Sequence, residues 1–202
     1  EIRNQIEFMK ECQKNVKKIL AICWGMQVAV TAAGGEVKKA NNSHIGIANK
    51  ITINGEGLYN PLYKGKDKIF NSPAFNFDEV VTLPQNAICL ASNKINKVQS
   101  LYFEVNESKI WGLQYHPEYN LYEMARLTWC RIDKLLKLGF FKDRDAGENY
   151  VRLLETLHKD PERKDLSWIL GIDNDVLDQN IRCIEVKNWI ENLVIPAMIN
   201  HG

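Results

Sequence analysis

Apolar residues at the start of the chain recur at helical spacing and then change period twice. Steps of three and four positions predict an amphipathic helix over 2–16. A continuous apolar run at 19–23 predicts a short buried strand, and a second helical pattern follows at once and ends at Gly34-Gly35. The turn between this strand and this helix falls at Cys23. A strand, a sharp turn and a helix in this order expose the turn residue at the carboxyl end of a sheet.

Strand patterns fill most of the chain between residues 36 and 118. Short apolar or alternating runs bounded by turn residues predict strands over 46–53, 79–83, 87–91, 98–105 and 110–115. Turns are predicted at 54–55 and 84–86, and the polar residues 106–109 predict a hairpin between the last two strands.

Helical spacing returns after residue 119. It predicts helices over 121–138, 147–158, 161–170 and 175–200. No repeat, low-complexity tract or linker interrupts the chain. We therefore predict a single α/β core, 1–118, with a helical C-terminal extension, 119–202, packed on it.

The composition is that of an ordinary globular protein. The 202 residues are 45% hydrophobic and 25% charged, which is enough for one domain with a sizeable core. The net charge of +1 gives no bulk attraction to nucleic acid or to an anionic membrane, and no apolar stretch is long enough to cross one. The five cysteines are scattered without zinc-ligand spacing, which favours a reducing compartment. We therefore expect a cytoplasmic protein without a metal or other cofactor.

Cys23 is the first candidate for chemistry. A thiol at a helix N-terminus lies at the positive end of the helix dipole, which favours the nucleophilic thiolate. We expect Gly25 to let the backbone turn tightly beside it, and the backbone N–H of Trp24 to donate to an oxyanion. A cysteine after an apolar run is also a common core residue, so Cys23 alone does not define a site.

His116 and Glu118 are the second candidate. Pro117 ends the last predicted strand, so His116 projects from a strand terminus and Glu118 follows two residues later. A carboxylate that accepts a hydrogen bond from Nδ1 fixes the imidazole tautomer and leaves Nε2 to face a thiol. A lone histidine before proline is more often a turn residue. Together with Cys23, however, the pair predicts an acyl-transfer site that works through a thioester.

The two segments that carry these residues resemble the signatures of one enzyme family. Residues 22–27 (Ile-Cys-Trp-Gly-Met-Gln) and 112–118 (Gly-Leu-Gln-Tyr-His-Pro-Glu) resemble the nucleophile motif and the His-Pro-Glu motif of class I, triad-type glutamine amidotransferases. Residues 44–48 and 72–80 are similar to stand-alone proteins related to the amidotransferase part of GMP synthase. The resemblance covers most of 15–118.

The resemblance implies a flavodoxin-like α/β sheet and a role for each motif residue. Cys23 would be the nucleophile, His116 the general base and acid, and Glu118 the carboxylate that orients the imidazole. Three further positions would hold the substrate glutamine: Gln27, Asn76 and Phe77.

Two departures from the family pattern carry expectations of their own. Ala21 stands where the family has a glycine, and we expect its methyl group to be tolerated. Only 22 residues precede Cys23, whereas the family has several dozen, which form the first strands and supply a second oxyanion donor. We therefore expect a sheet that lacks its first strands, with an exposed edge and reduced activity.

The implied reaction is hydrolysis of the side-chain amide of L-glutamine to glutamate and ammonia. The chain has no phosphate-binding loop of the form G-x-x-x-x-G-K-[ST], so an ammonia acceptor would be a separate synthase subunit. Two alternatives stay open. One is a hydrolase of γ-glutamyl amides or peptides that uses the same triad, and the other is a non-catalytic partner subunit or fragment.

Overall fold

The structure is a computed structural model that describes residues 1–199. Six strands form one mixed sheet in the order β1-β6-β5-β4-β2-β3. The strands are β1 (Lys18–Ile22), β2 (Glu36–Ile53), β3 (Ile69–Thr82), β4 (Ile88–Ser92), β5 (Ser100–Val105) and β6 (Ser108–Leu113). The α-helices are α1 (Ile2–Asn15), α2 (Trp24–Ala32), α3 (Gly55–Leu58), α4 (Leu121–Cys130), α5 (Ile132–Lys137), α6 (Arg144–Lys159), α7 (Lys164–Leu170), α8 (Asn174–Leu177), α9 (Gln179–Arg182), α10 (Ile184–Asn188) and α11 (Ile195–Ile199). A short 3₁₀ helix, η1 (Pro61–Tyr63), and a π-helical segment, η2 (Trp189–Val194), complete the set. The predicted α/β class with a helical C-terminal part is confirmed.

One parallel pairing brings the two halves of the predicted site together. β1 runs parallel to β6, and Ile22 at the end of β1 is level with Leu113 at the end of β6. The other strand pairs in the described sheet are antiparallel, and β5–β6 is the predicted hairpin. Because parallel strands end at the same edge, Cys23 and the segment after Leu113 leave the sheet side by side.

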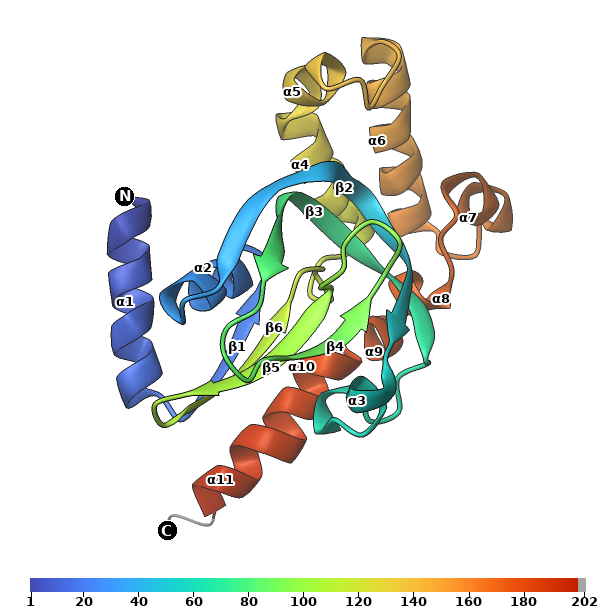
Figure 1. Cartoon of the computed structure of the whole chain (residues 1–202). Helices are drawn as coiled ribbons and strands as arrows, with labels where there is room; N and C mark the ends of the chain where they lie inside the picture. The colour runs from blue at the N-terminus through green and yellow to red at the C-terminus, as the bar shows by residue number, and fades with distance from the viewer. Residues whose placement is uncertain (200–202) are drawn as a thin grey trace.

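Helices cover both faces of this sheet (Figure 1). On one face, Met26 of α2 belongs to an apolar cluster with Leu101 and Phe103 of β5. On the other face, Leu193 of η2 joins a cluster with Trp111 of β6. A third apolar cluster lies among α4, α6 and α7, the helices at the top and right of Figure 1. Burial on both faces fixes the register of the central strands and therefore the place of the residues at their ends.

Two of the predicted helices are broken in the structure. The helix expected over 121–138 divides into α4 and α5 at Arg131, whose backbone angles of φ −116° and ψ 11° are not helical. The helix expected over 175–200 divides into α8, α9, α10, the π-helical segment η2 and α11. Neither proline nor glycine marks the break at Arg131, so its position depends on packing and not on local sequence.

The second and third strands are longer than predicted, and one predicted turn is a helix. β2 and β3 pair along an antiparallel ribbon whose polar residues, such as Lys38, are exposed and do not alternate with apolar ones. A strand without alternation leaves no period-2 signal. Residues 54–55 begin α3, because the side chain of Asn54 accepts a hydrogen bond from the Gly57 N–H and caps the helix.

Candidate active site

Cys23 occupies the predicted turn in a strained conformation. Its backbone lies at φ 50° and ψ −106°, in a region that residues other than glycine rarely adopt. Its N–H donates to the carbonyl oxygen of Leu113 at 2.6 Å, and its own carbonyl accepts from the Gln27 N–H at 3.1 Å. The thiol is therefore held between the end of β6 and the first turn of α2, at the helix N-terminus.

The glycine after the turn does not have the expected role. Gly25 is a helical residue without a positive φ, and a Cβ added there would meet Ala21 Cβ at 3.9 Å, an ordinary contact. The strain lies at Cys23 itself, so the expectation that Gly25 makes the tight turn is wrong. The methyl group of Ala21 is buried in the apolar cluster that also contains Met26 and Ala29.

Trp24 is the first residue of α2. Its N–H therefore has no acceptor within the helix and points out of the N-terminus, on the side of Cys23. Its indole Nε1 donates to Gln5 Oε1 of α1 at 2.8 Å, and the ring is about half exposed. The backbone N–H is thus available as the oxyanion donor expected from the sequence, while the side chain joins α2 to α1.

His116 and Glu118 form a close pair. His116 Nδ1 lies 2.6 Å from Glu118 Oε1, and the imidazole stacks on the ring of Tyr119 with centroids 4.1 Å apart. The His116 backbone N–H donates to the carbonyl oxygen of Pro73 at 2.7 Å, which fixes the segment against β3. With Nδ1 held by the carboxylate, Nε2 is left for the proton transfers of a catalytic imidazole.

The surroundings of His116 favour its protonated form. Burial of the imidazole acts to lower its pKa, but hydrogen bonds to Cys23 and Glu118, together with the negative charges of these groups, outweigh it and raise the pKa to about 9. Cys23 Sγ lies 3.9 Å from the Phe75 carbonyl oxygen, and the His116 N–H donates to the Pro73 carbonyl oxygen two residues earlier in β3, so both residues pack against the same stretch of that strand. The structure therefore brings Cys23, His116 and Glu118 into one constellation.

Gln114, which the sequence reasoning did not single out, completes a polar chain to the thiol. It is fully buried, and its Nε2 lies 3.5 Å from Cys23 Sγ. Its Oε1 accepts from Gln27 Nε2 at 3.1 Å, which also donates to the carbonyl oxygen of Asp78. A buried amide two residues before the histidine, on the same face of the chain, is the signal that could have indicated it.

The predicted substrate residues Gln27 and Asn76 are buried near the thiol. Both donate their side-chain amide to the carbonyl oxygen of Asp78, each at 3.1 Å. The Asn76 Oδ1 atom has no hydrogen-bond partner among the described residues. Their amide groups thus fix the scaffold behind Cys23, and their contact with substrate stays a prediction.

Phe77 lies on a different side of β3 from Asn76. Its ring lies under the Lys134 ammonium group at 3.9 Å, and the ring of Phe75 lies 5.2 Å from the Arg131 guanidinium group. The Phe75 carbonyl oxygen is 3.9 Å from Cys23 Sγ. Phe77 therefore packs against the segment after the α4–α5 break, and its contact with substrate stays a prediction.

The C-terminal helices hold the His116 segment from behind, a role that the sequence did not indicate. Arg182 Nε and Cys183 Sγ both lie within hydrogen-bond distance of the Pro117 carbonyl oxygen, at 3.2 and 3.1 Å. On the other side of His116, Tyr115 OH donates to Glu185 Oε1 at 2.8 Å, and buried Lys66 pairs with Glu185 Oε2 at 3.0 Å. These contacts fix the backbone on both sides of the imidazole.

No metal or membrane feature accompanies this site within residues 1–199. The described part of the chain contains no group of three or more His, Cys, Asp or Glu residues arranged to hold a metal ion. No helix in the same part of the chain is long and apolar enough to span a membrane.

Comparison with known families gives the class of this fold and site. Residues 1–127, more than half of the chain, match the family described as "Glutamine amidotransferase class-I". The chain therefore belongs to the class I glutamine amidotransferases, which confirms the resemblance of its two motifs.

Two curated relatives and one solved structure refine this comparison. A γ-glutamyl-L-1-hydroxyisopropylamide hydrolase from a Pseudomonas species is 28% identical over 199 residues, which are 96% of this chain and 66% of the relative. A subunit of the glutamine-hydrolysing GMP synthase of Methanococcus aeolicus is 37% identical over 121 residues, which are 58% of this chain and 61% of the relative. The chain thus spans about two thirds of the length of these relatives or less. A crystal structure of a glutamine amidotransferase from Thermotoga maritima has the same fold, with a TM-score of 0.64 at 17% identity over 94% of this chain and 70% of that one.

Proposed function

We propose that this protein hydrolyses the γ-amide of a glutamyl substrate through a thioester on Cys23. The observation that carries the proposal is a strained cysteine at a helix N-terminus beside a His116–Glu118 pair whose imidazole has its pKa raised to about 9. At neutral pH the imidazole is therefore protonated next to the sulfur. An imidazolium beside a thiolate is the ready state of a cysteine nucleophile.

The two steps follow from this starting state. Cys23 Sγ attacks the amide carbon, the C–N bond breaks, and the nitrogen leaves with the proton of His116 Nε2. The neutral imidazole then takes a proton from water, the resulting hydroxide attacks the thioester carbon, and the thiolate leaves. Glu118 holds the imidazole in the tautomer that both transfers need. The sum is one amide and one water converted to one carboxylate and one protonated amine.

Two groups around the thiol support the charged states of this reaction. The Trp24 N–H at the start of α2 donates to the oxyanion of each tetrahedral intermediate, and one such donor typically lowers the barrier by about 3–4 kcal/mol. The Gln114 side-chain amide donates to the sulfur and stabilises it as a thiolate. Gln27 positions Gln114 and, through the resemblance, is also proposed to contact the substrate.

L-Glutamine is the simplest substrate of this class, and its amide nitrogen would leave as ammonia. The similarity to a subunit of a GMP synthase supports an ammonia acceptor on a separate synthase chain. The similarity to a γ-glutamyl-L-1-hydroxyisopropylamide hydrolase over nearly the whole chain supports a second candidate, in which a larger amine leaves in place of ammonia. Glutamate is the common product of both reactions.

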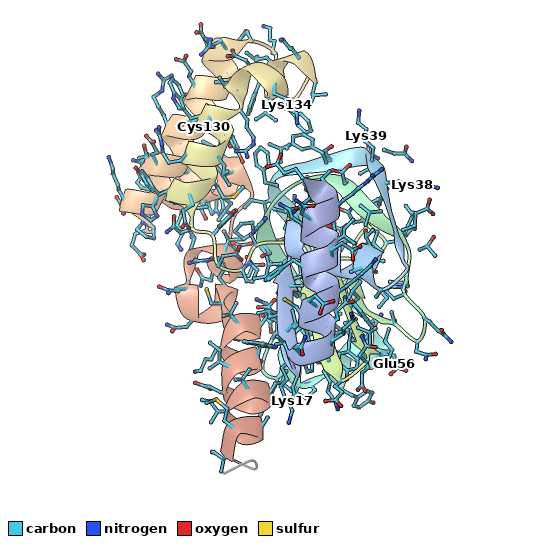
Figure 2. The ribbon with its side chains drawn as sticks, turned by 90° about the vertical axis from the view of Figure 1, so that its left-hand side faces the viewer. Lys17, Lys38, Lys39, Glu56, Cys130 and Lys134 are labelled. Carbon is cyan, nitrogen blue, oxygen red and sulfur yellow. The ribbon has the colours of Figure 1, made fainter. Side chains whose placement is uncertain are left out.

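The first test is glutamate release by this chain from L-glutamine and from a γ-glutamyl alkylamide. We expect C23S to lower kcat by at least about a thousandfold, because loss of a nucleophile removes the thioester route. C130S is the matched control, since Cys130 is an exposed cysteine at the end of α4 (Figure 2). Unchanged turnover by C23S would rule out the mechanism.

A thiol assay separates an enzyme from a non-catalytic subunit. We expect iodoacetamide at pH 6 to modify Cys23 much faster than Cys130, as judged by peptide mass spectrometry, because the imidazolium of His116 lies beside the sulfur. Equal, slow modification of both cysteines would instead favour the binding subunit.

A further inference from the structure

Tyr119 lies flat against the imidazole of His116, outside the constellation of Cys23, His116 and Glu118. The two rings are stacked, with their centroids 4.1 Å apart and their planes 4° from parallel. Glu118 contacts the edge of the same imidazole, at 2.6 Å from Nδ1. Two neighbouring residues therefore hold His116 in different ways, one at a ring nitrogen and one over a ring face.

A tight turn places both groups around one side chain. The Tyr119 N–H donates to the His116 carbonyl oxygen at 3.2 Å, which closes a β-turn with Pro117 as its second residue. Proline favours this position because its ring fixes φ near the value that the turn needs. The turn brings Tyr119 back over His116, while Glu118 between them contacts the ring edge.

The start of α4 fixes Tyr119 from the other direction. Asn120 caps this helix: its side chain accepts from the Glu123 N–H at 3.0 Å, and Glu123 Oε2 accepts from the Asn120 N–H at 2.7 Å. Reciprocal capping of this kind fixes the chain where it enters a helix. The Tyr119 side chain also packs against the apolar cluster among α4, α6 and α7. Its backbone is thus held by the turn and the cap, and its ring by the cluster and the imidazole.

Glu118 alone does not determine the orientation of the imidazole. The side chain of Glu118 is 39% exposed, whereas that of His116 is 11% exposed, so solvent screens the contact between them. A single hydrogen bond at Nδ1 also leaves the plane of the imidazole free to tilt. A flat aromatic contact restricts this tilt, because it would separate the stacked faces. The stack therefore keeps Nε2 pointing in one direction.

The face of the tyrosine ring also suits the charged state of His116. A cation over an aromatic face is attracted by the quadrupole of the ring, more strongly where water is excluded. Tyr119 itself stays neutral: burial, and then the negative charges of Glu118 and Cys23, raise the pKa of its hydroxyl above the ordinary 10, whereas Arg131 acts to lower it. Glu118 and Cys23 are also the charged groups that act on His116. A neutral ring thus supports the imidazolium between them.

We propose that Tyr119 is a positioning residue of the active site, which holds the His116 imidazolium by its ring face with Nε2 directed at the reacting atoms. The proposal rests on the function proposed above and adds one residue to its machinery. Tyr119 takes no proton and forms no bond. Because it acts through the imidazole alone, it is needed for the proton transfers and not for binding of the glutamyl substrate.

The test replaces Tyr119 with leucine, which keeps an apolar side chain over the imidazole but removes the aromatic face. We expect Y119L to lower the pKa of His116, measured by NMR titration without substrate, because the charged form loses a favourable contact. In glutamate release, Y119L should lower kcat by about tenfold with little change in KM, which is less than loss of the imidazole would cost. Y119F should match the wild type in both measurements, since it keeps the ring.

Y122L is the matched control. Tyr122 lies on α4, but its ring is exposed and its centroid lies 5.9 Å from that of His158. The same substitution there should leave the pKa of His116 and kcat unchanged. If Y119L does not fold, as judged by circular dichroism, Tyr119→Phe is compared with Tyr119→pentafluorophenylalanine. The fluorinated ring has nearly the same shape but a reversed quadrupole, so it should lower the pKa of His116.

An unchanged His116 pKa or an unchanged kcat in folded Y119L would overturn the proposal, since the stack would then not support the proton transfers. Equal His116 pKa values with the two rings, fluorinated and not, would overturn it as well. The NMR titration needs no turnover, so it separates this proposal from the proposed function. If the wild type releases no glutamate but Y119L lowers the pKa, the proposed function fails while the hold of Tyr119 on the imidazolium stands.

Discussion

At the scale of single residues, the site depends on a cysteine with a strained backbone and on a histidine whose pKa is raised. Holding a residue such as Cys23 at φ 50° costs about 1–3 kcal/mol, and the hydrogen bonds of its N–H and carbonyl to Leu113 and Gln27 keep it there. That conformation places the sulfur outside the core, within reach of His116 and Gln114. Gly25 does not make this turn, although the sequence suggested that it would.

The raised pKa of His116 predicts how activity depends on pH. Its value of about 9 lies above the ordinary 6.5, so the fold stabilises the imidazolium. This stabilisation is fully present below about pH 6.5 and is lost as pH rises through about 9. Because the imidazolium donates the proton to the leaving amine, kcat/KM should fall as pH rises through about 9, as measured by glutamate release across pH 6–10.

The same pKa offers a test that does not need turnover. In C23A the hydrogen bond and the negative charge that Cys23 supplies are gone, so the pKa of His116 should move down, and in E118Q it should do the same. An NMR titration of the imidazole in each variant measures the change. An identical His116 pKa in C23A and wild type would show that the two groups do not interact.

Substitution of Gly112 and of Gly25 by alanine should have opposite effects on stability. A Cβ at Gly112 in β6 would lie 2.5 Å from Met26 Cγ, whereas one at Gly25 would meet only Ala21 Cβ at 3.9 Å. We expect G112A to lower the free energy of unfolding by about 1–3 kcal/mol through overpacking. G25A should be neutral or stabilise by up to about 1 kcal/mol, because alanine favours a helix. Urea denaturation measures both, and equal stabilities would contradict the close approach of α2 to β6.

At the scale of elements, the C-terminal helices act as a support for the His116 segment. α9 and the start of α10 reach the Pro117 carbonyl oxygen through Arg182 and Cys183, and they reach Tyr115 through Glu185. Arg182 also donates to the carbonyl oxygen of Val176, so one buried guanidinium joins the end of α8 to the active-site segment. His116 is thus held from two sides by a part of the chain far along the sequence.

Substitution of Arg182 should affect both stability and the site. R182M removes two hydrogen bonds to buried carbonyl groups, each worth about 1.5–3 kcal/mol when the donor is charged, and should lower the melting temperature. R163M is the matched control, because the Arg163 side chain is exposed and, among residues 1–199, hydrogen-bonds only to Asp165. R182K keeps the charge without the forked geometry, so it should fold but lower kcat and shift the pH profile. If R182M and R163M have the same melting temperature, and R182K keeps the wild-type kcat and pH profile, the Arg182 contacts are not needed to hold the His116 segment.

The sequence predicted the parts of this architecture that are encoded locally. The order of strand, Cys23 turn and helix, the β5–β6 hairpin and the His116–Glu118 spacing all follow from short patterns. The break at Arg131, and with it the placing of Lys134 over Phe77, has no local signal. The contact of Arg182 with Pro117 joins residues 65 positions apart, and no pattern along the chain indicates such a contact.

At the scale of the whole molecule, three apolar clusters fix the elements that carry the site. Two lie between the sheet and the helices on its faces, and the third lies among the C-terminal helices. The sheet provides the ends of β1 and β6, α1 and α2 cover one face, and α10 and η2 cover the other (Figure 1). The α4–α7 group, with its own cluster, places α5 beside the β2–β3 ribbon, where the two form a pocket. The site therefore lies where a rigid sheet meets a separately packed helical group.

The parallel pairing of β1 with β6 also has a consequence for how the protein matures. Ile22 and Leu113 are 91 positions apart, and closing so long a loop is slow and costs entropy before the contact returns any stability. Until those two strands meet, Cys23 has neither its strained backbone nor its imidazole neighbour. A nascent or partly folded chain thus carries a chemically ordinary cysteine. On the mechanism proposed above, the sulfur therefore becomes reactive only in a chain in which β1 and β6 have paired.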